Sequence, residues 1–195
     1  MDQVLQFRVE LLGVSPPVWR LIQVPASYTL WDLHVAIQDS MGWKDQHLHA
    51  FRIVGSATTF GIPDEEDDDP FQTIPGWETK VQDVFSFRDQ VGTYEYDFGD
   101  SWIHLILFEG YEPSKQGESF PRCLGGARRC PPEDCGGPEQ YAELLVGMRD
   151  STHPEHESII DWLGGDIDPE EFNSELVRFD DPKARWGYSN RGLKR

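Results

Sequence analysis

The sequence has few cysteines and no long apolar run, and it lacks a leader of the secretory type. Three cysteines in 195 residues are an odd number, which would leave one thiol unpaired in an oxidising compartment. No apolar segment approaches the roughly 20 residues needed to span a bilayer. The first residues show neither a basic region nor an apolar stretch of signal-peptide type. We therefore expect a soluble, cytoplasmic protein whose cysteines are reduced thiols or metal ligands.

Basic residues are also scarce. The chain has 17 Lys and Arg against 35 Asp and Glu, a formal charge of -18 at pH 7. Sequence-independent DNA binding depends on cations that neutralise phosphates, so direct nucleic-acid binding is disfavoured. The charge favours a protein partner with a basic surface. Residues 183–195 are an exception, and we expect a solvated basic tail there. Its basic residues are Lys183, Arg185, Arg191, Lys194 and Arg195.

The first 55 residues change their hydrophobic period twice. Apolar and polar residues alternate over residues 5–11, the pattern of a half-buried strand, and residues 18–24 follow as a second β-rich run after a Gly/Pro turn. Thr29 and Asp32 then form a capping-box-like start to an apolar helical stripe that ends before Gly42. Residues 47–55 supply another strand. The order strand, strand, helix, strand predicts the opening of a β-grasp-like sheet.

The remainder of the chain predicts strands followed by helices. We interpret residues 56–80, with six consecutive acids at 64–69, as a surface insertion, because the spacing of an EF-hand calcium loop is absent. Residues 80–87 fit either a helical turn or a strand. The runs 94–98 and 102–108 predict a hairpin around Gly99.

After Phe120, glycine and proline predict irregular structure as far as Pro138. Helical spacing then appears at 139–148, at 156–163 and in a short segment within 168–179. The prediction is one α+β domain over residues 1–195. Its first part, 1–110, is a β-grasp-like mixed sheet with a helix packed on it, and residues 120–180 hold the Gly/Pro/Cys segment and C-terminal helices.

Three motifs carry a family resemblance. They are LWDLHVAIQDSMGWKDQHLHAF, YEYDFGDSWIH and CLGGARRCPPEDCGGPEQY, in this order. Together they resemble the plasmid pRiA4b ORF-3-like family over residues 4–180. The resemblance implies an α+β domain and an association with plasmids and mobile elements, some members being labelled transposon passenger proteins. It implies no established reaction.

Asp97, Asp100 and His104 surround one tight turn and are the catalytic candidates. Two carboxylates and an imidazole can bind a divalent metal or act as general acid and base. The same aspartates commonly hold turns through hydrogen bonds from the backbone, and His104 falls on a strand that is apolar on both faces. The sequence leaves both interpretations open.

Histidines and cysteines supply two further candidate metal sites. His47 and His49 are two residues apart in a predicted strand, so we expect them on one face, where His34 from the preceding helix can join them. A packing role is the alternative. The thiols Cys123, Cys130 and Cys135 are separated by six and four residues, looser than in a zinc knuckle. They fit a structural zinc site, reduced buried thiols or a catalytic thiol.

Three classes of function remain. The sequence favours a non-enzymatic protein-interaction module, because nothing in it requires catalysis. The alternatives are a metal-dependent hydrolase or nuclease-like enzyme that uses Asp97, Asp100 and His104, and an acidic mimic of DNA. No cofactor is required, although zinc or another divalent metal fits the candidate ligands.

Overall fold

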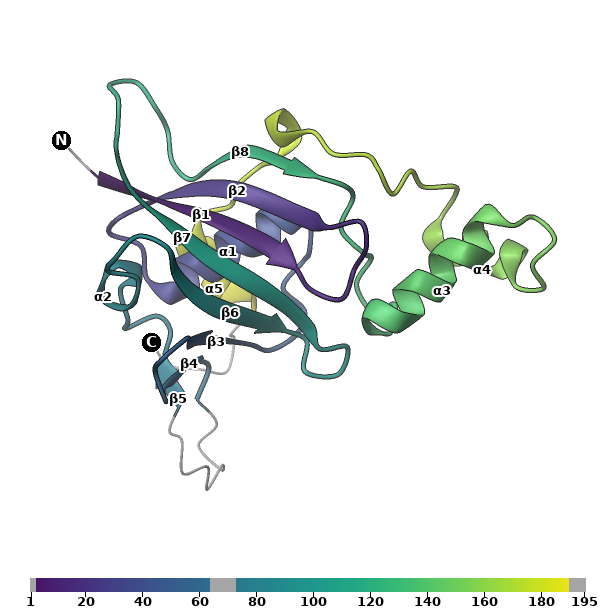
Figure 1. The fold of residues 1–195 in the computed structure, drawn as a ribbon, viewed down its shortest axis with the longest axis horizontal. Coiled ribbons are helices and arrows are strands. Elements are labelled where there is room, and N and C mark those ends of the chain that lie inside the picture. The colour runs from purple at the N-terminus through teal and green to yellow at the C-terminus, as the bar shows by residue number, and fades with distance from the viewer. Residues whose placement is uncertain (1–2, 64–72, 190–195) are drawn as a thin grey trace.

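A single twisted sheet of eight strands forms the centre of the molecule (Figure 1). The computed structural model describes residues 3–63 and 73–189. The strand order is β5-β4-β3-β6-β7-β1-β2-β8, with all neighbours antiparallel except β4 and β5. The strands are β1 (Gln3–Leu11), β2 (Val18–Pro25), β3 (His49–Ile53), β4 (Thr59–Gly61), β5 (Thr73–Pro75), β6 (Gln90–Tyr96), β7 (Trp102–Pro113) and β8 (Arg122–Ala127).

Helices cover one face of the sheet and extend beyond one end of it. Helix α1 lies behind the central strands, whereas α3 and α4 project from the sheet as a pair (Figure 1). Within the described ranges, no helix is long and apolar enough to cross a membrane. The helices are α1 (Leu30–Met41), α2 (Val81–Val84), α3 (Gly137–Arg149), α4 (His156–Leu163) and α5 (Pro182–Ser189), with a 3-10 turn η1 (Ser174–Leu176).

The hairpin and helix predicted for the first 55 residues are confirmed. β1 and β2 pair antiparallel, and both belong to the same sheet as β3. The side chain of Thr29 accepts a hydrogen bond from the backbone of Asp32, whose carboxylate in turn accepts from the backbone of Thr29, which closes a capping box at the start of α1. Gly42 ends the helix with φ of 90°. The apolar stripe of α1 is buried against the sheet at Leu30, Leu33, Ile37 and Met41.

The predicted hairpin around Gly99 is also confirmed, as β6 and β7. β7 lies between β6 and β1, so it is a central strand. Trp102 and His104 are buried on its inner face, whereas Ile103 on the other face is partly exposed. The segment left open at 80–87 contains the helix α2, and the short helix expected within 168–179 is reduced to the 3-10 turn η1.

The prediction of irregular structure after Phe120 is wrong, because β8 forms there as the strand beyond β2. Its low strand propensity is overcome by tertiary contacts. The buried guanidinium of Arg20 on β2 donates hydrogen bonds to the carbonyl oxygens of Ala127 and Arg128 at 2.9 Å. At Gly126, an added Cβ would lie 2.6 Å from the backbone of Trp19 and from the ring of Phe172. The glycine therefore permits the close approach that completes the edge of the sheet.

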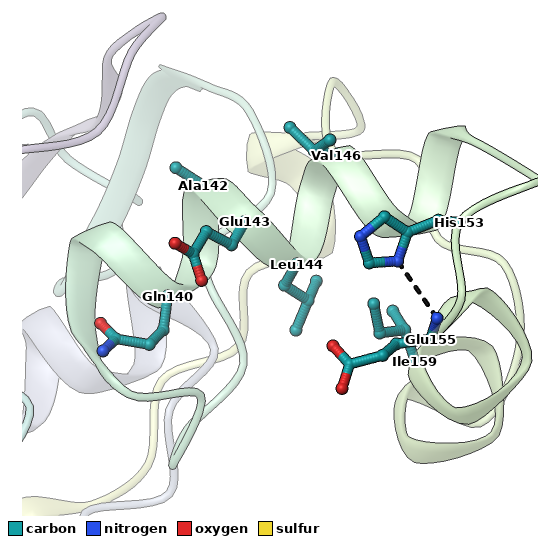
Figure 2. A pocket seen from close by; sticks show the side chains of 8 residues that line it. All are labelled: Gln140, Ala142, Glu143, Leu144, Val146, His153, Glu155 and Ile159. Carbon is teal, nitrogen blue, oxygen red and sulfur yellow. Dashed lines mark hydrogen bonds between the residues drawn. The ribbon is translucent and has the colours of Figure 1, made fainter.

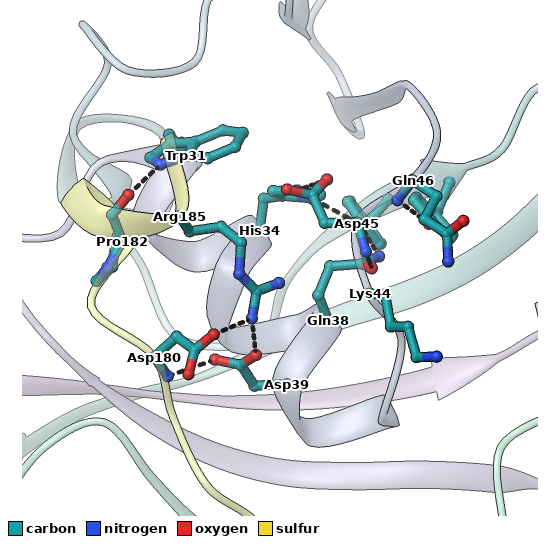
Figure 3. Close-up of polar contacts among 12 residues, drawn as sticks. Trp31, His34, Gln38, Asp39, Lys44, Asp45, Gln46, Asp180, Pro182 and Arg185 are labelled. Carbon is teal, nitrogen blue, oxygen red and sulfur yellow. Dashed lines mark hydrogen bonds and ion pairs between the residues drawn. The ribbon is translucent and has the colours of Figure 1, made fainter. Parts of the chain in front are cut away.

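The prediction of a solvated basic tail is wrong for residues 182–189, which form helix α5 against α1. Figure 3 shows Arg185 between the carboxylates of Asp39 and Asp180, and Trp31 donating its indole N–H to the carbonyl of Pro182. Trp186 is buried and meets the Trp31 ring edge-on, with centroids 4.9 Å apart. Apolar burial and a paired arginine thus order a segment whose composition is polar. Arg191, Lys194, Arg195 and the acidic stretch 64–69 lie outside the described residues.

The fold is therefore mixed α+β, as predicted, with one large sheet and few helices. The eight-stranded order does not confirm the β-grasp specifically. Apolar side chains from β1, β2, β6 and β7 form the main core beneath α1. This core fixes the positions of the strands. The candidate site lies beside the ends of these strands.

Candidate functional site

The segments that carry the three motifs meet at one end of the sheet. Residues 42–47 follow α1, residues 97–101 join β6 to β7, and residues 130–137 lead into α3. Trp43 donates its indole N–H to the carbonyl of Pro131 at 2.9 Å, and its ring stacks on Tyr96 with centroids 5.0 Å apart. We call this region the motif junction.

Glu133 fastens the motif junction. One of its carboxylate oxygens accepts from the hydroxyl of Tyr96 at 2.5 Å, and the other accepts from the backbone N–H of Lys44 and the amide of Gln46. Burial, and then the hydrogen bond to Glu133, raise the pKa of Tyr96 above its ordinary value, so its hydroxyl remains a donor. The residues on either side of Glu133 are consequently held in place.

His47, Asp97 and Asp134 form a cluster at this junction. Nε2 of His47 lies 2.9 Å from Oδ1 of Asp134 and 3.6 Å from Oδ2 of Asp97. One ligand atom from each of the three residues lies within 4.8 Å of the other two. The Nε2 atom of His47 is buried. Despite the short distance to Asp134, no group among residues 3–63 and 73–189 has hydrogen-bonding geometry to this atom. The Asp134 side chain is 61% exposed, so the cluster is open to water on that side.

The backbone around Asp97 aims its carboxylate at His47. Oδ1 of Asp97 accepts from the backbone N–H groups of Gly99 at 3.0 Å and Asp100 at 3.3 Å, which leaves Oδ2 toward the imidazole. Asp97 has φ of 57° and Asp134 has φ of 59°, left-handed conformations that aspartate tolerates better than most residues. The turn chemistry expected at Asp97 therefore also orients a free oxygen.

Asp100 and His104 do not join Asp97 in a shared site. The carboxylate of Asp100 accepts from the N–H of Gly136 at 2.9 Å and so ties the β6–β7 turn to the segment before α3. His104 is fully buried, with Nδ1 3.2 Å from the carbonyl of Tyr94. Burial is the main cause that lowers the pKa of His104 to about 4. Of the three catalytic candidates, the structure places only Asp97 beside other potential ligands.

The three histidines expected to converge are divided between two places. β3 begins at His49, so His47 precedes the strand, and the prediction that both lie on one face of a strand is wrong. His34 and His49 stack with centroids 3.6 Å apart and an angle of 8° between the rings. Nε2 of His34 lies 2.8 Å from Oδ1 of Asp45, and its Nδ1 lies 2.8 Å from the hydroxyl of Tyr94; Figure 3 shows His34 beside Asp45.

The stacked histidine pair favours packing over metal binding. Imidazole lone pairs lie in the plane of the ring, and two parallel planes 3.6 Å apart do not direct them at one ion. Both rings are buried, and burial, followed by the charge of His34, holds the pKa of His49 well below its usual range. His49 is therefore a neutral ring at physiological pH.

All three cysteines are free thiols: Cys123 lies in β8, and Cys130 and Cys135 lie in the motif junction. Cys130 is buried, whereas Cys123 and Cys135 are half-buried. Burial raises the pKa of all three, that of Cys135 to about 12. In the part of the chain that the structure describes, none belongs to a group of His, Cys, Asp and Glu close enough to hold an ion. As arranged here they are protonated thiols, the state expected of packing cysteines.

A groove between α3 and α4 begins beside the motif junction. The larger of its two pockets has a volume of about 570 Å³. Figure 2 shows the side chains that line this pocket, with apolar residues from α3 and α4 and the two glutamates Glu143 and Glu155. A second pocket of about 290 Å³ shares Leu144, Glu155 and Ile159 with the first and reaches Asp134 and Cys135. We call the two together the α3–α4 groove.

Sequence reasoning missed Asp134 and Asp45 as partners of the histidines. Asp134 lies between two prolines and a cysteine, and a lone acid in such a segment gives no spacing signal. Its contact with His47 depends on the packing of Glu133 and Trp43, which joins segments about 90 residues apart. Only the tertiary fold shows that contact.

Comparisons with known proteins agree with the architecture. The family model for plasmid pRiA4b ORF-3-like protein matches residues 3–176. The chain is 38% identical over 192 residues to the uncharacterized protein y4hQ of Sinorhizobium fredii, with 94% of each chain covered. It is also similar to the crystal structure of the protein of unknown function MM3350 from Methanosarcina mazei Go1. That match has a TM-score of 0.82 and 38% identity, and it covers 92% of this chain and 99% of the other.

Proposed function

This chain belongs to the plasmid pRiA4b ORF-3-like family, and within it we propose that the protein is a divalent-cation-dependent hydrolase whose ion is held by His47, Asp97 and Asp134. The observation that carries the proposal is the convergence of one imidazole and two carboxylates at the motif junction. Two of these residues, His47 and Asp97, are among the candidates that the sequence singles out. Asp134 completes the set.

The ligand set suits a divalent metal of intermediate hardness. Carboxylate oxygens favour Mg²⁺ and Mn²⁺, whereas imidazole also favours Zn²⁺ and Fe²⁺. Both aspartates lie in supported positions, because Asp97 is oriented by two backbone N–H groups and Asp134 follows the anchored Glu133. Such outer contacts fix ligand orientation in metal sites.

Three protein ligands leave at least one coordination position for water. The exposed side of the cluster at Asp134 supplies the access that a catalytic ion needs. An ion held there would lower the pKa of a bound water and so supply a nucleophile for hydrolysis at neutral pH. The α3–α4 groove, which reaches Asp134, offers space for a substrate beside that water.

Metal uptake and hydrolysis test the proposal together. Protein without a histidine tag is loaded with Mn²⁺ or Zn²⁺, and the metal content and the cleavage of nitrophenyl esters and phosphates are measured. We expect one ion per chain, activity that EDTA removes, and loss of both in His47→Ala and Asp134→Asn. Asp100→Asn is the matched control, because Asp100 lies beside the cluster but binds Gly136, and it should retain the ion. A wild-type chain without a bound ion contradicts the proposal.

A second candidate function is protein interaction without catalysis. The observation that favours it is the α3–α4 groove, which combines apolar walls with exposed Val146 and Trp162 on a projecting helix pair. The charge of -18 supports a partner with a basic surface. An acidic DNA mimic stays a prediction that rests on this charge alone.

A further inference from the structure

We infer that the α3–α4 groove binds an amphipathic helical segment of a partner protein, with apolar anchor residues flanked by lysine or arginine. The inference rests on the second candidate function, protein interaction, and adds the chemistry of the partner. It does not require the proposed cation, although the groove is the same one that would hold the substrate of the proposed hydrolase. The evidence lies in how α3 and α4 are buried, what lines the groove and how charge is distributed around it.

The helix pair leaves apolar surface that the protein itself does not cover. α3 buries Tyr141, Leu145 and Met148 against the core. α4 has no fully buried residue: Ile159, Ile160 and Leu163 pack partly against the core, and Trp162 is left exposed. Val146 is 62% exposed and Trp162 is 52% exposed. Exposed large apolar residues beside a pocket are typical of an interaction site.

The groove is preformed by a close contact between the two helices. At Gly147 of α3, an added Cβ would lie 2.4 Å from the Cδ1 atom of Ile159 on α4. The ring of His156 also lies against the Gly147 carbonyl, with Nδ1 2.9 Å from the oxygen. Nδ1 of His153 accepts the N–H of Glu155, which fixes the connection between the helices, as Figure 2 shows. A preformed groove binds a segment without the entropic cost of ordering its own walls.

The walls and the rim specify different parts of the occupant. Ala142, Leu144, Val146 and Ile159 form an apolar floor, which suits apolar anchor residues on one face of a helix. Glu143 and Glu155 stand at the rim, and among the described residues neither lysine nor arginine lines either pocket. Apolar anchors with basic neighbours complement this arrangement.

The charge of the whole chain disfavours other occupants. Two copies, each with a formal charge of -18, repel one another, and the rim glutamates offer a second copy no basic complement. Nucleic acids and anionic lipid surfaces are repelled for the same reason. A basic amphipathic protein segment is the occupant that gains from both the apolar floor and the acidic rim.

A synthetic peptide tests the inference. The probe is a helical peptide of about 14 residues with leucines at i, i+3, i+4 and i+7 and lysines elsewhere, its binding measured by fluorescence anisotropy at about 150 mM salt. Val146→Glu is the decisive variant, because it adds a negative charge while blocking the apolar floor. Non-specific attraction predicts unchanged or tighter binding by this variant, whereas docking in the groove predicts binding weakened about tenfold or more.

Leu176→Glu is the matched control. Leu176 is 67% exposed on η1, outside the groove, so the same charge change there should leave the affinity unchanged. Equal binding by wild type and Val146→Glu would overturn the groove as the site while leaving protein interaction elsewhere on the surface. Failure of the wild type to bind the Leu/Lys peptide, or equal binding of a Leu/Glu peptide, would overturn the partner chemistry. The metal content of each variant reports separately on the cation proposal.

Discussion

Trp102 and Ile103 are adjacent residues that we expect to contribute very unequally to stability. Trp102 is 1% exposed and packs near Trp43, whereas Ile103 is 36% exposed on the other face of β7. Trp102→Ala should lower the free energy of unfolding by about 3–5 kcal/mol, the range for a buried aromatic, and Ile103→Ala by less than about 1 kcal/mol. Midpoints of denaturant unfolding measure both. Similar losses in the two variants would show that the inner face of β7 is not a core.

His104 makes stability depend on pH. Burial lowers its pKa to about 4 in the folded protein, against about 6.5 in the unfolded chain. Between about pH 6.5 and pH 4 the unfolded chain binds a proton at this histidine that the folded protein does not bind. The contribution of neutral His104 to the free energy of unfolding is therefore fully present above about pH 6.5 and is lost as pH falls toward 4. The slope approaches about 1.4 kcal/mol per pH unit.

The variant His104→Gln isolates this effect, because glutamine does not titrate and can still donate to the Tyr94 carbonyl. Unfolding free energies of wild type and variant should converge as pH falls from 7.5 to 5. Other titrating groups contribute equally to both proteins. Parallel pH profiles would mean that His104 has the same pKa in the folded and unfolded states, as an exposed histidine would.

At the scale of elements, α5 is held to α1 by two kinds of contact: packing between tryptophan rings and an arginine that lies between two carboxylates. Trp186 packs on Trp31 and Trp77, and Arg185 bridges Asp39 and Asp180. Trp186→Ala should release α5 and increase proteolysis within residues 182–189, with a loss of about 2–4 kcal/mol if release is coupled to unfolding. Limited proteolysis and hydrogen exchange measure the release.

Lys183→Ala provides the matched control for α5. Lys183 is exposed on the same helix, and its replacement by alanine deletes a charge at the surface. Its rate of cleavage should equal that of the wild type. Faster cleavage in both variants alike would show that α5 depends on charge and not on the tryptophan contact.

Elements with a clear hydrophobic period were predictable, and those ordered by tertiary contacts were not. The strands β1, β2 and β7 and the helix α1 follow from alternation or from a capped apolar stripe. β8 contains two adjacent glycines, and it forms because Arg20 and the β2 backbone provide partners for it. The hydrophobic period of a segment indicates which of its own faces is buried, but it does not indicate which other segments will pair with it.

The candidate site shows the same division. Asp97 was identifiable because aspartates around a glycine turn are a local signal, and the hydrogen bonds from Gly99 and Asp100 agree with it. The pairing of His47 with Asp134 was not, because it depends on the anchoring of Glu133 by Tyr96. Residue types were predictable here, but which of them meet was decided by packing.

For the whole molecule, the excess of acid over base lowers stability through repulsion. The charge of -18 is spread over a chain whose ion pairs are mostly at the surface, where each contributes little. Raising NaCl from about 20 mM to about 300 mM shortens the Debye length from about 20 Å to about 6 Å. Repulsion between carboxylates should weaken more than the few exposed pairs do.

We therefore expect the melting temperature at pH 7.5 to rise with NaCl, by about 2–4 °C for each kcal/mol of repulsion removed. The same titration at pH 5 is the control, because the net charge is closer to zero near the sequence pI of about 4.5. The salt-induced rise should be smaller there. Calorimetry at both pH values measures it. A melting temperature that falls with salt at pH 7.5 would instead show that attractive pairs, such as Arg185 with Asp39 and Arg128 with Glu170, outweigh the net repulsion.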